Sequence, residues 1–333
     1  MGASHMSRRA FAALAGSAAL LAAAPQAFAQ QEFPVKGGKP IRIVVPFPAG
    51  GGTDAQARIV SQKLGELLGT TVIVDNRGGA STMLGASEVA RSAPDGYTVL
   101  YAPSSTMAQN PHTLANVPYD PFKDFTPITL GGRGPLVLMV SGEVPASNVK
   151  ELVAYMKANA GKVSYATFGA GTSSHIYGEM FLKKTGTEAV HVPYKGGSDA
   201  AKDLIGGRVQ LFFDSAASAI ITASGGKARI IAIASDSRIA AMPEVPTLAE
   251  QGVTGLDLPS WLGFYGPAKM PPAVVKTLHD GIAKVLAMPD VKEFYRKGGY
   301  EAGAMSPEDF AKLTRVTYDR WGTVIQQLGM AKQ

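Results

Sequence analysis

Two glycine-rich segments are the parts of this sequence best suited to bind a small anion. The first, residues 47–54, reads Phe-Pro-Ala-Gly-Gly-Gly-Thr-Asp, follows the apolar run 41–45 and leads into a helical pattern. The second, residues 167–175, lies between a strand pattern and a helix pattern in the other half of the chain. Glycine lets the backbone approach a ligand closely, and the free N–H groups at a helix start favour negative charge. Two such segments predict a ligand with two anionic ends, held between domains.

Neither segment carries the motif of a nucleotide site or a complete catalytic motif. The first lacks the Gly-Lys-Ser/Thr of a P-loop, and in the second Ser174 stands where a dinucleotide fingerprint needs its third glycine. A Gly-x-Ser-x-Gly motif is also incomplete, because His175 replaces the last glycine. The histidines lack metal-ligand spacing and the sequence has no cysteine. We expect a binding protein with no cofactor and no metal; the alternative is an enzyme, either a serine hydrolase using Ser173 and His175 or a nucleotide-dependent transferase.

Further candidate residues lie where strands lead into helices. Tyr194 precedes another helix pattern, where its ring could form a pocket wall, while the adjacent Lys195 is expected to be solvated. Asp214 ends the apolar strand 210–213, and open α/β sheets bind ligands beyond the carboxyl ends of their strands. Capping of the next helix explains this aspartate equally well.

The composition indicates a folded protein that is exported. Of 333 residues, 46% are hydrophobic and 17% charged, which is enough apolar sequence for two domains. Residues 1–29 have the pattern of a cleaved signal peptide, with two arginines, an apolar run too short to span a bilayer and a small-x-small site at 27–29. The arginine pair is compatible with Sec or Tat export. Removing this segment leaves 32 − 2 = 30 basic and 26 acidic residues, a net charge of +4 that is too scattered to favour nucleic acid.

Beyond Pro40, apolar strands alternate with amphipathic helices, which is typical of α/β layers with mostly parallel sheets. The expected strands are 41–45, 71–75, 97–101, 136–140, 162–166, 189–192, 210–213 and 229–234. The chain from 271 onward is expected to be mostly helical, with Ser306 capping a helix that has proline at its first position.

Several motifs, taken in order, resemble those of the Bug-type solute receptors of tripartite tricarboxylate transporters. The resemblance spans nearly the whole mature chain, and each motif by itself is weak. The motifs are PFPAGGGTD at 46–54, NRGGA at 76–80, APDGYT at 93–98, YDPFKDF at 119–125, VPYKG at 192–196, MPEVPT at 242–247 and WLG at 261–263.

The resemblance implies a two-lobed α/β periplasmic binding protein of type II, whose lobes are joined by crossing strands and close on a small carboxylate. Lobe 1 would comprise 33–134 plus 253–333, and lobe 2 would comprise 135–252. One ligand carboxylate would meet Phe47, Ala49, Gly50, Gly51, Gly52, Thr53, Asp54, Ser104 and Ser105. The far end would meet Thr167, Phe168, Gly169, Ala170, Gly171, Thr172, Ser173, Ser174, Tyr194 and Asp214.

The function implied is capture of a small organic acid, most simply a dicarboxylate, with an amino acid or an aromatic carboxylate as other options. The receptor would deliver this ligand to the membrane subunits of the transporter, acting as a periplasmic monomer. A binding protein that signals instead of transporting has the same sequence requirements, because both need only a surface that changes with ligand.

Overall fold

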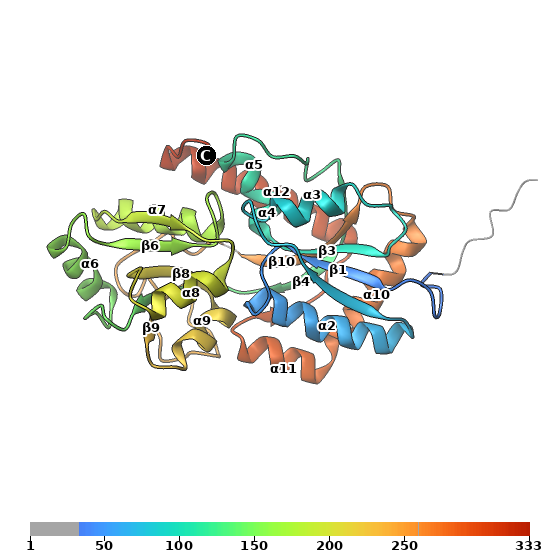
Figure 1. The fold of residues 1–333 in the computed structure, drawn as a ribbon, viewed down its shortest axis with the longest axis horizontal. Helices are drawn as coiled ribbons and strands as arrows, with labels where there is room; N and C mark the ends of the chain where they lie inside the picture. Colours follow the sequence, from blue (N-terminus) through green and yellow to red (C-terminus); the bar gives the residue numbers. More distant parts are fainter. Residues whose placement is uncertain (1–32, 259) are drawn as a thin grey trace, which may run out of the picture.

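Two α/β lobes lie side by side in the computed structural model, which describes residues 33–258 and 260–333 (Figure 1). The expected signal peptide, residues 1–29, lies outside the described residues. None of the helices in the described part of the chain combines the length and apolarity needed to cross a membrane.

The first lobe is built on a six-stranded sheet. Its strands, in spatial order, are β11 (Glu301–Ala302), β4 (Phe125–Arg133), β10 (Trp261–Pro267), β3 (Thr98–Pro103), β1 (Ile41–Val45) and β2 (Val72–Asn76). Helices α2 (Gly52–Leu68), α10 (Pro272–Ala287) and α11 (Pro289–Lys297) cover one face. Helices α3 (Met83–Ala90), α4 (Ser104–Ala108) and α12 (Pro307–Leu328) cover the other, and the short α5 (Asn110–Thr113) follows α4.

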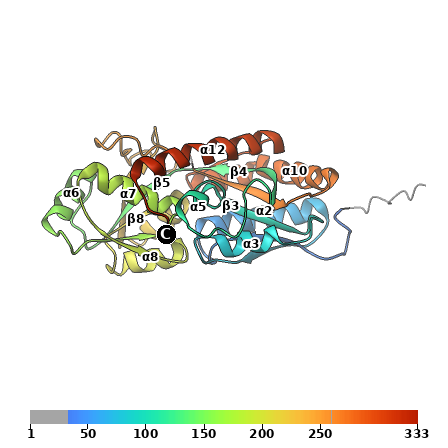
Figure 2. The same ribbon diagram turned by 90° about the horizontal axis from the view of Figure 1, so that it is seen from above.

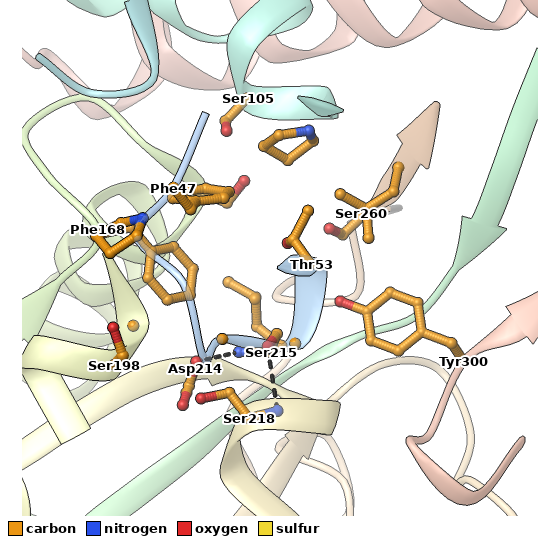
Figure 3. A pocket seen from close by; sticks show the side chains of 18 residues that line it. Phe47, Thr53, Ser105, Phe168, Ser198, Asp214, Ser215, Ser218, Ser260 and Tyr300 are labelled. Atoms are coloured by element: carbon orange, nitrogen blue, oxygen red, sulfur yellow. Dashed lines mark hydrogen bonds between the residues drawn. The ribbon is translucent and has the colours of Figure 1, made fainter. Parts of the chain in front are cut away.

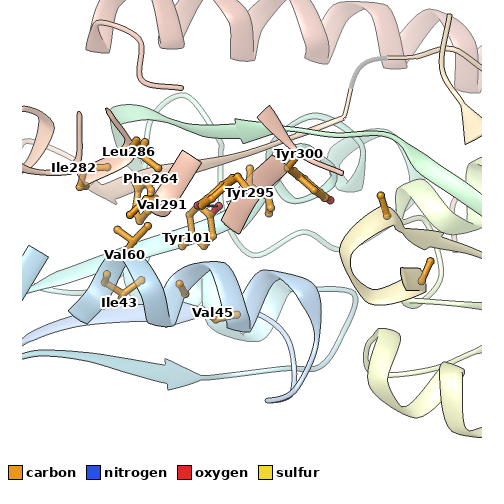
Figure 4. Packing of buried hydrophobic residues seen from close by; sticks show 14 of the residues in the cluster. Ile43, Val45, Val60, Tyr101, Phe264, Ile282, Leu286, Val291, Tyr295 and Tyr300 are labelled. Carbon is orange, nitrogen blue, oxygen red and sulfur yellow. Dashed lines mark hydrogen bonds between the residues drawn. The ribbon is translucent and has the colours of Figure 1, made fainter. Parts of the chain in front are cut away.

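The alternation of side chains along β1 explains these three layers. Ile43 and Val45 pack with Val60 of α2 on one face, whereas Val44, between them, packs with Ala86 of α3 on the other. Because both faces are covered, β1 reads as a continuous apolar run in the sequence. Figure 4 shows the first of these cores, which continues to Tyr300 at the side of the second lobe.

The second lobe is built on a five-stranded sheet. Its spatial order is β7 (Val190–Pro193), β6 (Ser164–Thr167), β8 (Leu211–Ser215), β5 (Leu136–Ser141) and β9 (Ala228–Ala234). Helices α6 (Val149–Ala158) and α7 (Ser173–Thr185) pack on one face, and α8 (Gly197–Ile205) and α9 (Ala216–Ala223) pack on the other.

The prediction of mostly parallel sheets is wrong. Four strand pairs, β1–β2, β1–β3, β6–β7 and β6–β8, are parallel. The other five pairs among the described strands are antiparallel, and each includes β4, β5 or β10. These three strands lie at the crossings between the lobes, and not all of them are connected to their neighbours through a helix. The helical crossover that makes the strands of a βαβ unit parallel therefore does not set their direction.

The lobes are joined at two crossings and by the last helix. The chain leaves the first lobe at Gly134, whose N–H donates to the Ser260 carbonyl of the returning segment over 3.2 Å. Helix α12 has 22 residues and runs along both lobes (Figure 2). Ser306 caps it by accepting a hydrogen bond from the Asp309 N–H, which confirms the predicted helix start. Its Trp321 packs in the second-lobe core although the sequence assigned this segment to lobe 1.

The return point of the chain also lies later than the sequence indicated. Val253, Leu256 and Leu258 pack in the core of the second lobe, and the chain enters the first-lobe sheet at Trp261. Side-chain packing therefore places the segment 253–258, which was expected in lobe 1, with lobe 2.

Candidate functional site

A pocket lies between the two lobes beside the crossings (Figure 3). The residues that line it are Phe47, Pro48, Gly51, Gly52, Thr53, Pro103, Ser105, Leu136, Phe168, Ser173, Gly197, Ser198, Asp214, Ser215, Ser218, Ser260, Leu262 and Tyr300. Both lobes contribute, and this set contains no lysine, arginine or histidine. Any charge that binds here is therefore met by backbone dipoles, hydroxyl groups and one carboxyl group.

The starts of five helices of the described chain meet at this pocket. Gly52 begins α2, Ser173 begins α7 and Gly197 begins α8, while Pro103 is the N-cap of the short α4 and Ser215 is the N-cap of α9. The caps of α2, α7 and α8 make no side-chain capping hydrogen bond, whereas the Ser215 side chain accepts one from the Ser218 N–H. Free N–H groups and the helix dipole both favour an anion at such positions. The pocket is therefore suited to an anion although no cationic side chain lines it.

The first-lobe loop, residues 47–54, is held in shape by its own aspartate. Asp54 Oδ2 accepts the Gly50 N–H over 2.9 Å and the Arg58 Nε–H over 3.0 Å. Asp54 Oδ1 accepts the Asn76 amide over 3.0 Å. Gly50 has φ +88°, which a residue with a side chain rarely adopts. This arrangement turns the backbone of Gly51 toward the pocket and removes Asp54 from it.

Those hydrogen bonds also decide the charge of Asp54. Burial opposes ionisation, but the hydrogen bonds from Arg58, Gly50 and Asn76 together lower the pKa of this carboxyl below its ordinary value. Asp54 therefore stays ionised as a fixed part of the loop.

The second-lobe loop, residues 167–175, is held by two stacked histidines. His175 and His191 lie 4.0 Å apart between ring centroids. The Gly171 N–H donates to His175 Nδ1 over 3.0 Å, and His191 Nε2 lies 2.7 Å from Thr167 Oγ1. Burial lowers the pKa of both histidines to about 4. Both rings are therefore neutral at neutral pH and support the loop instead of binding an anion.

The two loops touch each other across the pocket. The rings of Phe47 and Phe168 meet edge to face with centroids 6.0 Å apart. Ser173 Oγ, on the second lobe, donates to Gln109 Oε1 on the first over 2.8 Å. A Cβ atom added to Gly52 would lie 2.9 Å from the Ala217 Cβ, so this close approach requires glycine. The structure therefore represents a closed arrangement of the lobes.

Asp214 differs from the other polar residues that line the pocket because one of its side-chain oxygens is both buried and without a partner. Its side chain is fully buried, and Oδ1 accepts the Ser215 N–H over 2.7 Å. Oδ2 has no hydrogen-bond partner among the described residues. Burial raises the pKa of Asp214 to about 7, against a smaller opposing effect of Ser218 and Ser215.

Eight of the residues proposed from the sequence line the pocket: Phe47, Gly51, Gly52, Thr53, Ser105, Phe168, Ser173 and Asp214. The others do not line it: Ala49, Gly50, Asp54, Ser104, Thr167, Gly169, Ala170, Gly171, Thr172, Ser174 and Tyr194. Several of these stabilise the loops themselves. Ser174 Oγ donates to the Phe213 carbonyl over 2.7 Å, and the Tyr194 hydroxyl donates to Asp203 over 2.7 Å.

Sequence reasoning missed ten lining residues: Pro48, Pro103, Leu136, Gly197, Ser198, Ser215, Ser218, Ser260, Leu262 and Tyr300. Some had a usable signal, because Gly197 and Ser198 follow a strand and begin a helix as the two glycine-rich loops do. Tyr300 had none, since only the packing of the chain beyond α11 brings it to the pocket.

The residues of the hydrolase alternative are not assembled for catalysis. Ser173 donates its hydroxyl to Gln109, and His175 Nδ1 accepts from the Gly171 backbone. A nucleophile needs a base within hydrogen-bond reach that is in turn oriented by an acid. No group of three side chains suited to a metal ion occurs within residues 33–258 and 260–333.

Comparison of the sequence with known protein families shows the family to which this chain belongs. The profile of the tripartite tricarboxylate transporter family receptor matches residues 56–330. The chain belongs to this receptor family. This confirms the resemblance seen in the motifs, and the protein is a solute-binding receptor.

Solved structures share the fold over most of their length. The periplasmic binding protein BugD is 34% identical, with 88% of the receptor and 99% of BugD covered and a TM-score of 0.84. Rpa4515 of R. palustris with adipate is 31% identical, with 91% and 100% covered and a TM-score of 0.87. MatC of Rhodopseudomonas palustris with bound malate is 28% identical, with 88% and 100% covered and a TM-score of 0.83. These likenesses confirm the two-lobed α/β fold.

Proposed function

We propose that this receptor captures a small dicarboxylate between its lobes and delivers it to the membrane subunits of a tripartite tricarboxylate-type transporter. The observation that carries the proposal is the meeting of five helix starts at a pocket lined by no cationic side chain. The ligands of Rpa4515 and MatC, adipate and malate, are consistent with it.

One carboxylate would bind the first-lobe loop and the other would bind the second lobe. The backbone of Gly51 to Thr53 and the Ser105 hydroxyl supply donors on the first side. Ser173, Ser198 and the start of α8 supply donors on the second. Hydrogen bonds to a charged acceptor contribute about 1.5 to 3 kcal/mol each, so a few suffice for micromolar affinity.

Transport requires that the membrane subunits recognise the loaded form. Contacts from both lobes to one ligand exist only when the lobes are closed, so binding shifts the population toward the closed form. The closed surface would be the signal for delivery. The mature receptor would act as a monomer after removal of residues 1–29, and it would carry out no catalysis.

A thermal shift screen of the purified receptor tests this function. Adipate and malate are expected to raise the melting temperature, whereas hexanoate, which has the chain length of adipate but one carboxylate, is expected to have a much smaller effect. Native mass spectrometry would give the stoichiometry of one ligand per chain. Stabilisation by no dicarboxylate, or turnover of an ester or a nucleotide, would contradict the proposal.

A further inference from the structure

Asp214 is the only acidic side chain among the residues that line the pocket between the lobes. It lies at the end of β8 immediately before α9, and none of its surface is exposed to solvent. Oδ1 is used by the Ser215 N–H, whereas Oδ2 is buried and meets no donor among the described residues. A buried polar atom without a partner costs about 1 to 3 kcal/mol. Because Asp214 lines the pocket, a ligand bound there would supply the partner that Oδ2 lacks.

The surroundings of Asp214 offer no positive side chain to balance an ionised carboxylate. Strand β5 and helix α9 carry no titratable side chain beside it, and the nearby Tyr300 is neutral, because burial and then the charge of Asp214 raise its pKa. The charged and titratable groups of the other elements packed against β8 are His175, Tyr177, Glu179, Lys183 and Lys184 on α7, Asp199, Lys202 and Asp203 on α8, and Tyr165 on β6.

These neighbouring groups make their own interactions. Asp199 pairs with Lys202 and Asp203 pairs with Arg208. His175 accepts the Gly171 N–H, as described above. Asp214 therefore has no counterion, and desolvation favours its neutral form.

The charge balance of the site points in the same direction. Each helix start carries a partial positive charge, so the helix starts at the pocket favour the two negative charges of a dicarboxylate. They are the positive ends that this lining offers, since it contains no cationic side chain. An ionised Asp214 would bring a third negative charge beside the far carboxylate, and like charges at this distance disfavour each other strongly.

We propose that Asp214 is protonated in the loaded receptor and that its Oδ2–H donates a hydrogen bond to the far carboxylate of the dicarboxylate. This inference rests on the function proposed above and adds that the receptor takes up a proton from solvent with its ligand whenever Asp214 is ionised in the free form. The same protonated carboxyl selects against a ligand with an ammonium group at its far end, because an ammonium group offers no acceptor to the Oδ2–H. Burial raises the pKa of Asp214 to about 7, so the uptake falls within an accessible pH range.

Calorimetric titration of the receptor with adipate and malate tests this inference. Measured in phosphate and in Tris at pH 8.5, the buffer dependence of the heat is expected to report uptake of nearly one proton per ligand. The dissociation constant is expected to be about 20-fold higher at pH 8.5 than at pH 6.5, because a group with a pKa near 7 must be reprotonated at the higher pH.

A substitution at the carboxyl separates this role from an acceptor role. Asp214→Asn keeps a donor of similar shape without a titratable proton, so it is expected to bind adipate about tenfold more tightly than the wild type at pH 8.5, with no proton uptake. Asp199→Asn removes an exposed carboxyl of α8 that pairs with Lys202 and does not line the pocket. It is expected to keep the pH dependence of the wild type.

The outcomes distinguish the two proposals. Binding of adipate or malate without proton uptake and with equal affinity at both pH values would overturn the role of Asp214 alone. Loss of affinity in Asp214→Asn at pH 6.5, with tight binding of an amino acid by the wild type, would show an ionised acceptor instead. Absence of binding by every dicarboxylate would overturn the proposed function and, with it, this inference.

Discussion

Two buried aspartates, one in each lobe, have opposite charge preferences at the same site. Asp54 is 4% exposed and Asp214 is fully buried, so both lose nearly all their hydration. The pKa of Asp54 is nevertheless lowered, because Arg58, the Gly50 N–H and Asn76 donate to its oxygens. The pKa of Asp214 is raised to about 7, because burial is not compensated by a cation and one oxygen lacks a donor. Burial by itself therefore does not decide the charge of a carboxyl group; the donors around it do.

The difference assigns separate tasks to the two lobes. The first lobe uses its acid to shape a loop and presents backbone to the ligand, which suits any carboxylate. The second lobe presents its acid to the pocket together with the hydroxyls of Ser198 and Ser218, whereas the Ser173 hydroxyl donates to Gln109 of the first lobe. Selectivity among ligands is therefore expected to reside mainly in the second lobe.

The largest effect on ligand affinity is expected from a side chain added at Gly52, where the two lobes approach each other closely. Gly52→Leu would place a Cβ 2.9 Å from the Ala217 Cβ and 3.2 Å from the Ser215 Oγ of the opposite lobe. The lobes could then not close, and the affinity for adipate is expected to fall at least 1,000-fold, or about 4 kcal/mol, by calorimetry. Leucine is a good helix former, so the fold should persist.

A matched substitution controls for the added side chain. Gly225 follows α9, and a Cβ atom added there meets nothing within 4 Å. Gly225→Leu is expected to bind adipate like the wild type. Wild-type affinity in Gly52→Leu would refute the requirement for close approach at the start of α2.

A smaller effect, on the free energy of unfolding, is expected when the carboxyl of Asp54 is removed. Asp54→Ala leaves Arg58, the Gly50 N–H and Asn76 without their acceptor, and it is expected to reduce the free energy of unfolding by about 3 kcal/mol at pH 7. Because the pKa of Asp54 is lowered in the folded state, its stabilisation is present above the ordinary value of 3.8 and lost as the pH falls through the folded-state pKa. Urea denaturation at pH 7 and pH 3 measures this. An equal deficit at both pH values would contradict the charge argument.

In the absence of ligand, the contribution of Asp214 to the stability of the fold is expected to depend on pH in the opposite direction to that of Asp54. Because the folded-state pKa of Asp214 is raised to about 7, its contribution to stability is present below the ordinary value of 3.8 and lost as the pH rises through 7. Asp214→Asn is expected to increase the free energy of unfolding at pH 8 by about 2 kcal/mol, within the limit of roughly 4 kcal/mol that the shift sets. Thermal melts at pH 5 and pH 8 measure it. A variant less stable than the wild type at pH 8 would show that Asp214 is ionised at no cost in the free receptor.

Local patterns predicted the elements of this fold well because they depend on neighbouring residues. The apolar run 41–45 formed the expected strand, and Ser306 capped the expected helix start. Both predictions succeeded because the hydrophobic period of a segment and the capping of a helix depend on residues close together in the sequence. The parallel character of the sheets was predicted wrongly, because strand direction at the crossings depends on how the two lobes are joined. The two glycine-rich loops were found from composition, but they contribute unequally, since five of the eight residues 47–54 and only two of the nine residues 167–175 line the pocket.

The sequence by itself determined the family, the α/β layers and the two loops that contribute to the pocket. Those properties follow from glycine content, hydrophobic period and the order of short motifs. Only the tertiary structure decided which groups line the pocket, because Ser260 and Tyr300 reach it through the crossing and through packing beyond α11. It also decided the protonation of Asp54 and Asp214, since the pKa of a buried carboxyl depends on donors that lie far apart along the chain, such as Asn76.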